Sequence, residues 1–117
     1  MKKYLLSAGA IFGVLILSNC NPSKKIADTP PPKLTYRSNL STVIMNNCSP
    51  CHIPAKGGRK KAYDNYAAVK TDIDEMIRRI ELNPTDKGFM PFKTTSRLPD
   101  STIAVFKQWR TDGLLEN

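Results

Sequence analysis

The sequence predicts an all-α domain, because several segments repeat apolar side chains at helical spacing. No segment alternates apolar and polar residues in the way that a half-buried strand would. Prolines and glycines bound the helical segments, which is typical of short helices joined by loops. We therefore expect the folded region to be built from helices alone.

An export signal precedes that region. Lys2 and Lys3 are followed by the apolar stretch 5–17, which is too short for an ordinary membrane span and suits a signal peptide. The stretch LSNC resembles a bacterial lipobox, in which the cysteine becomes the acylated N-terminus. We expect 1–19 to be a lipoprotein signal peptide and Cys20 to carry the lipid. The alternative is an uncleaved signal anchor.

A linker separates the signal from the domain. Residues 20–35 are rich in proline and poor in large apolar side chains, as in a stiff, extended spacer. Loss of 1–19 removes two lysines and lowers the formal charge from +8 to +6. We expect an exported, membrane-anchored protein that faces the periplasm, with its folded domain at 36–117 and no nucleic-acid partner.

The first helix is predicted by four residues at positions i, i+3, i+4 and i+7: Leu40, Val43, Ile44 and Asn47. Ser38 or Asn39 is its expected cap, and Ser49-Pro50 ends it. Tyr63, Tyr66 and Ala67 suggest a second, short helix.

A third helix is predicted in TDIDEMIRRIELNP, with an apolar face of Ile73, Met76, Ile77 and Ile80 and with Pro84 as its end. The last helix is predicted in LPDSTIAVFKQWRTDG, with one stripe of Ile103, Phe106, Trp109 and Arg110. Asp100 is its expected cap, and Gly113 is its expected stop.

The folded region is small for a hydrophobic core that must stand alone. It spans the 82 residues from Tyr36 to Asn117, a size at which an exported domain usually needs a further source of stability. With Cys20 expected to carry lipid, only Cys48 and Cys51 remain, and their loop is too short to join distant parts of the chain. A large apolar cofactor would supply the missing core.

The motif CSPCH holds Cys48, Cys51 and the only histidine of the chain, His52. A thioredoxin-like dithiol would need a strand before the motif, and a structural zinc site would need a fourth Cys or His ligand in the domain. Two chance thiols in an oxidising compartment would be a liability. Covalent haem attachment explains each residue: two thiols for the two vinyl groups, and an imidazole for the iron. We expect one haem c per chain.

The second axial ligand is expected to be a methionine, because no other histidine exists. Met45 lies three residues before Cys48, on the proximal side, and Met76 lies on an apolar helix face, where core packing explains it. Met90 lies in the loop DKGFMPF, 38 residues after His52. We expect Met90 to bind the iron; the alternative is a buried loop methionine beside an empty or water-filled sixth site.

The chain resembles the small class I cytochrome c domains of bacterial electron transfer. Three segments carry the resemblance: YRSNLSTVIMNNCSPCHIP, GFMPF and LPDSTIAVFKQWRTDG. It implies three to five short helices around one covalently attached haem, with His52 as the proximal ligand and Met90 as the distal ligand. It also implies that the first and last helices cross, so that Leu40, Val43 and Ile44 would meet Phe106 and Trp109. The stretch 54–70 has no counterpart in it.

The expected function is electron transfer by a membrane-tethered monohaem carrier, since an iron with two protein ligands has no place for a substrate. The protein is therefore expected not to be an enzyme; a peroxidase would need an open distal site with an acid–base residue. The alternative function is a haem-based domain that binds a gas or another small ligand at an open or weak sixth site.

A basic run, KGGRKK, follows the motif and contains Lys56, Arg59, Lys60 and Lys61. It predicts either a surface that steers an acidic redox partner or a solvated loop. Anionic lipid headgroups are a third possibility.

Overall fold

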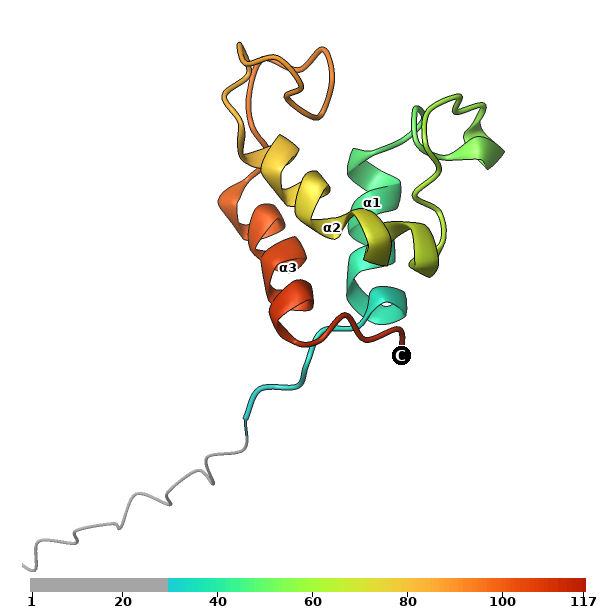
Figure 1. Cartoon of the computed structure of the whole chain (residues 1–117), viewed down its shortest axis with the longest axis vertical. Coiled ribbons are helices and arrows are strands. Elements are labelled where there is room, and N and C mark those ends of the chain that lie inside the picture. Colours follow the sequence, from blue (N-terminus) through green and yellow to red (C-terminus); the bar gives the residue numbers. More distant parts are fainter. Residues whose placement is uncertain (1–29) are drawn as a thin grey trace, which may run out of the picture. The chain divides into compact units, whose positions relative to one another are not determined.

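The computed structural model describes residues 30–117. Its helices, in chain order, are η1 (Tyr36–Leu40), α1 (Ser41–Asn47), η2 (Pro54–Lys56), α2 (Tyr66–Glu81) and α3 (Asp100–Thr111) (Figure 1). This part of the chain forms no strand, only an isolated bridge between Thr35 and Leu115. The prediction of an all-α domain is confirmed for these residues. The predicted signal peptide and Cys20 lie outside them.

The first helical segment begins earlier than the sequence predicts. η1 is a π-helical turn that continues directly into α1. Its cap is Thr35, whose hydroxyl accepts the Ser38 N–H at 3.2 Å, and the Asn39 side chain accepts the Thr35 N–H at 2.9 Å. The prediction of Ser38 or Asn39 as cap is therefore wrong, because Thr35 already reaches a free N–H of the first turn.

α2 is one helix where the sequence suggests two. Asn65 caps it by accepting the Ala68 N–H at 2.9 Å, and no residue between Tyr66 and Ile73 interrupts the backbone hydrogen bonds. Tyr63 lies before the helix rather than in it. The predicted apolar face is confirmed, and it also includes a residue of the first turn: Val69, Ile73, Met76, Ile77 and Ile80 are buried.

α3 starts at Asp100, which is its first residue and not its cap; Pro99 occupies the cap position without a side-chain hydrogen bond. Ile103, Phe106 and Trp109 are buried as predicted. Arg110 is exposed and pairs with Asp74 at 2.9 Å, so its place on the apolar stripe was wrong. Gly113 follows the helix with φ +100°, a conformation that glycine adopts readily, which agrees with its predicted role as stop.

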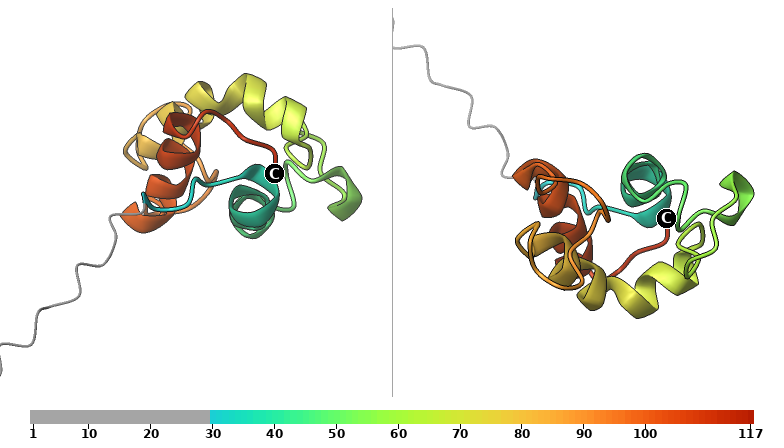
Figure 2. Two further views of the ribbon diagram at one scale, coloured as in Figure 1. Left: turned by 90° about the horizontal axis from the view of Figure 1, so that it is seen from below. Right: turned by 90° about the horizontal axis from the view of Figure 1, so that it is seen from above.

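One core joins the helices. η1 and α2 both pack against α3. In both views of Figure 2, the η1–α1 segment is seen nearly end-on, and α2 runs across the picture between it and α3. Leu40, Ile44, Phe106 and Trp109 belong to the same buried cluster, and Val43 packs at its edge.

The N-terminal segment is tied to the C-terminal segment. The Leu34 N–H donates to the Asp112 carboxylate at 2.7 Å, and the Tyr36 N–H donates to the Leu115 carbonyl at 2.8 Å. Ordered contacts thus begin two residues before the expected boundary at Tyr36. This junction lies at one end of the helices, and the loops 48–65 and 82–99 extend from the other end (Figure 1). Within residues 30–117, no helix is both long and apolar enough to span a bilayer.

Candidate cofactor site

A cavity of about 1000 Å³ opens at the loop end of the domain. Its lining comes from the end of α1, the loop after it, α2, the loop before α3, and Phe106 of α3. Cys48, Cys51, His52 and Met90, the four cofactor residues predicted within the domain, all line it. The fold therefore brings together side chains that are up to 42 positions apart in the chain.

The two thiols differ in their surroundings. Cys48 follows α1 directly, donates its N–H to the Ile44 carbonyl at 2.8 Å and is half-buried, whereas Cys51 is exposed in the following turn. Burial raises the pKa of the Cys48 thiol to about 11. Both are free thiols in the structure. A protonated, half-buried thiol is a poor nucleophile, which disfavours a redox dithiol.

The His52 ring is held by two contacts. Its Nδ1 lies 2.7 Å from the carbonyl oxygen of Lys61. The ring stacks on Tyr63, with 4.7 Å between the ring centres and 17° between their planes. A carbonyl oxygen only accepts, so in the neutral ring Nδ1 carries the proton and Nε2 keeps its lone pair. This is the tautomer that a metal ligand bound through Nε2 requires.

The segment after the motif wraps around it, which periodicity and motif spacing do not predict. The Lys60 N–H donates to the Cys51 carbonyl at 3.0 Å, and the Tyr63 N–H donates to the His52 carbonyl at 2.9 Å. Gly58 packs so closely that a Cβ atom there would lie 2.6 Å from the Cys51 carbonyl oxygen. The signal in the sequence was the Gly57-Gly58 pair so soon after CSPCH. These contacts give the beginning of the stretch 54–70 a structural role.

The loop that carries Met90 is fixed to the end of α2. The Met90 N–H donates to the Arg79 carbonyl at 3.2 Å, and the Arg79 side chain reaches the Gly88 carbonyl at 3.4 Å. Gly88 has φ +93°, a conformation that other residues adopt with strain. Phe89 is buried, and Met90 is half-buried against the core. Met90 is thus held by its backbone, with its side chain at the cavity.

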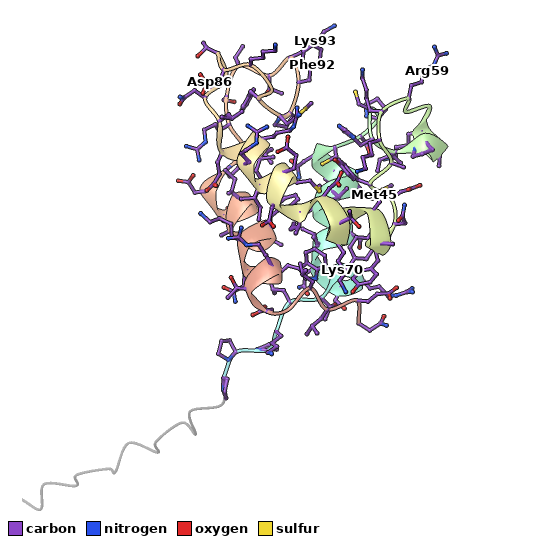
Figure 3. All side chains as sticks on the ribbon, in the orientation of Figure 1. Met45, Arg59, Lys70, Asp86, Phe92 and Lys93 are labelled. Carbon is purple, nitrogen blue, oxygen red and sulfur yellow. The ribbon has the colours of Figure 1, made fainter. Side chains whose placement is uncertain are left out.

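The other two methionines of the domain lie differently. Met76 is buried on α2, as predicted, with 6% of its surface exposed, but it also lines the cavity. Met45 packs at the edge of the core and does not line the cavity (Figure 3). Met76 and Met90 are therefore the two methionines of residues 30–117 that line this space, beside the thiols of Cys48 and Cys51.

The walls combine apolar side chains with a charged rim. Apolar side chains are contributed by Met76, Ile80, Phe89, Leu98 and Phe106. Lysines and acidic residues share the rim: Lys60, Lys61, Lys87, Lys93, Asp72, Glu75 and Asp86. Hydrogen bonds from Arg78 and Arg79 lower the pKa of Glu75 to about 2, so this carboxylate is ionised and paired.

Two loop tips flank the rim. Phe92 is 68% exposed at the tip of one loop, beside Lys93, and Arg59 lies at the tip of the other (Figure 3). Lys60 and Lys61 of the predicted basic run line the cavity, and Arg59 extends the same basic surface outward.

Within residues 30–117, no three His, Cys, Asp or Glu side chains gather into a group that could hold a metal ion. Comparisons of the chain with protein-family models, with curated proteins and with solved structures returned no match.

Proposed function

We propose that this protein is an exported, membrane-tethered monohaem c-type electron carrier whose domain has the class I cytochrome c fold. One observation carries the proposal: both thiols, the only imidazole and the Met90 side chain line one cavity. A volume of about 1000 Å³ is at the upper end of the range for small-molecule and cofactor sites, about 300–1,000 Å³. Apolar walls with a few placed donors suit a porphyrin.

The residues present fit a covalently held haem. The S–H bonds of Cys48 and Cys51 would add across its two vinyl groups, forming two thioethers without an oxidant. His52 offers Nε2 as the proximal ligand, because Nδ1 is engaged by the Lys61 carbonyl. Met90 offers the distal thioether from a loop that is fixed to α2.

When bound, the haem would supply one-electron redox chemistry. Its reduction potential would be in the higher part of the haem range, because a thioether ligand raises it. The chain's own part would be to hold the iron through His52 and Met90 and to exclude water with the walls around Phe89 and Phe106. With two protein ligands on the iron, no site would be left for a substrate, so the role we propose is that of a carrier rather than an enzyme. Two further features support the fold: η1 packs against α3, and Gly113 ends the C-terminal helix.

The partner we propose is a redox protein with an acidic docking surface. Lys60, Lys61 and Lys93 lie at the rim, and the exposed Phe92 ring could contact an apolar patch on such a partner. A basic rim speeds encounter with an acidic surface, and the effect weakens with salt. The proposed lipid on Cys20 would keep the domain at the periplasmic face of a membrane.

Covalent attachment is the decisive test, because thioethers survive denaturation and coordination alone does not. Protein made in a host that attaches haem should keep a haem stain on a denaturing gel. The variant with Cys48→Ala and Cys51→Ala should lose the stain, whereas Cys20→Ser should keep it. Absence of stain in the wild-type protein would refute the proposal. Rapid carbon monoxide binding by the stained, reduced protein would instead indicate a ligand-binding domain.

A further inference from the structure

The two contacts that hold the His52 ring come from one short segment. Lys61 supplies the carbonyl oxygen at 2.7 Å from Nδ1, and Tyr63 supplies the stacked ring at 4.7 Å. The segment follows the motif and precedes α2, so the motif itself contains neither contact. Whatever fixes this segment therefore fixes the orientation of the imidazole.

Asp72 of α2 fixes it through both residues. The Tyr63 hydroxyl donates to Asp72 Oδ2 at 2.9 Å, and the Lys61 ammonium group pairs with the same oxygen atom. The Asp72 side chain is only 16% exposed and forms part of the cavity wall. A carboxylate only accepts, so the Tyr63 hydroxyl is the donor in this bond. One carboxylate thus joins α2 to both residues that touch His52.

We propose that Asp72 is a positioning residue that acts through Lys61 and Tyr63 to hold His52 in its Nδ1–H tautomer and in a fixed orientation. The inference rests on the proposed function for the identity of the group that Nε2 faces. A firm hydrogen bond from Nδ1–H makes the ring a more basic ligand, which favours ferric over ferrous iron. Loosening the segment should therefore raise the reduction potential.

Three variants separate the contributions. Asp72→Asn weakens both contacts to the segment, and Tyr63→Phe removes one hydrogen bond but keeps the stacked ring. Tyr63→Leu removes the hydrogen bond and the stack without any change of charge. The matched control is Asp74→Asn, two residues away on α2, where the side chain is 80% exposed and pairs with Arg110 on another face. It removes the same charge from the same helix without touching the segment.

The main measurement is the exchange rate of the His52 Nδ1 proton in the reduced, diamagnetic protein. A ¹⁵N-histidine label reports on this ring alone, since the chain has one histidine. Asp72→Asn and Tyr63→Leu should speed exchange by about threefold to tenfold, the factor expected for losing one hydrogen bond. The exchange rate of Tyr63→Phe should lie between that of the wild type and those of these two variants. The reduction potential should rise in the same order. Asp74→Asn should leave both quantities unchanged.

Two outcomes would overturn the inference: unchanged exchange in Asp72→Asn and Tyr63→Leu, or an equal change in Asp74→Asn. Failure of the proposed function would look different, because the wild-type protein would then carry no covalent haem. In that case the same labelled chain without haem still tests the network, since every contact in it is between protein groups. A wild-type ring there without a preferred Nδ1–H tautomer would overturn it.

Discussion

Replacing each cavity methionine in turn separates a ligand from a packing residue. Met90 and Met76 both line the cavity, but they are held in different ways. Met76 is 6% exposed on the buried face of α2, whereas Met90 is half-buried on a loop. If Met90 binds the iron, Met90→Ala should change the spectrum, and Met76→Ala should mainly change the stability.

The magnitudes follow from burial. Truncating a buried methionine to alanine costs about 2–5 kcal/mol, so Met76→Ala should lower the free energy of unfolding by at least about 2 kcal/mol. In a domain of this size, each kcal/mol lowers Tm by roughly 4–8 °C, which makes the expected shift at least about 8 °C. Met90→Ala removes less buried packing, so the packing contribution to its loss should be smaller. In contrast, Met90→Ala should lose the sulfur-to-iron absorption band completely.

The assay combines three measurements on the haem-loaded protein. The ferric spectrum should show the weak red charge-transfer band of sulfur on iron in the wild type and in Met76→Ala, but not in Met90→Ala. Reduced Met90→Ala should bind carbon monoxide, which the wild type should resist, and its reduction potential should fall. Met45→Ala is the control, because Met45 lies outside the cavity lining.

Loss of the band in Met76→Ala together with its survival in Met90→Ala would refute the ligand assignment and would leave the haem attachment standing. A wild type without the band that binds carbon monoxide readily would refute electron transfer as the function.

Three further predictions concern other parts of the chain. Gly58→Ala should lower the yield of attached haem far more than Gly57→Ala, because an added Cβ at position 58 would collide with backbone atoms. At position 57 the added Cβ meets open space, and the substitution costs only about 1 kcal/mol of backbone strain. Equal yields from the two variants would contradict this. Mass spectrometry of membrane-extracted protein should find a chain that starts at an acylated Cys20, and Cys20→Ser should abolish it; an intact Met1 would favour the uncleaved anchor. In haem-free Cys20→Ser protein, alkylation of Cys48 at pH 8 should be slow, because its pKa, raised from 9.0 to about 11, leaves about a hundredfold less thiolate. Alkylation should quicken as the pH rises toward 11, and a fast reaction at pH 8 would show that the thiol is not buried.

Much of the fold was predictable because its signals are local. The apolar faces of α2 and α3 were identified from spacing, and Gly113 was identified as a stop. The errors lie at the helix starts, where several side chains compete to satisfy the first N–H groups. Thr35 and Asn65 act as caps because of geometry that periodicity does not contain. The spacing of Tyr63 predicts a helix wrongly, because an aromatic residue that stacks on a histidine can have the same spacing as one that faces a core.

The candidate site also has a part that the sequence predicts and a part that it does not. Cys48, Cys51 and His52 are adjacent in the chain, so their chemistry could be predicted from their order alone. The contacts around His52 could not, because they require α2 to bring Asp72 beside a segment that precedes it by about ten residues. A carboxylate on a helix surface has no distinguishing mark in a single sequence. Its partners become evident only when the backbone path between them is known.

The hydrogen bonds between residues 36–37 and residues 115–116 have a mechanical consequence. Tyr36 and Arg37 donate to the carbonyls of Leu115 and Glu116 at 2.8 and 3.0 Å, and the Trp109 indole also donates to Leu115 at 2.8 Å. A pull on a membrane tether would therefore load these bonds and the aromatic core behind them. The loops around the cavity extend from the other end of the helices and would stay unstrained (Figure 1). If the proposed lipid anchor is present, the domain would swing on it with the load borne far from His52.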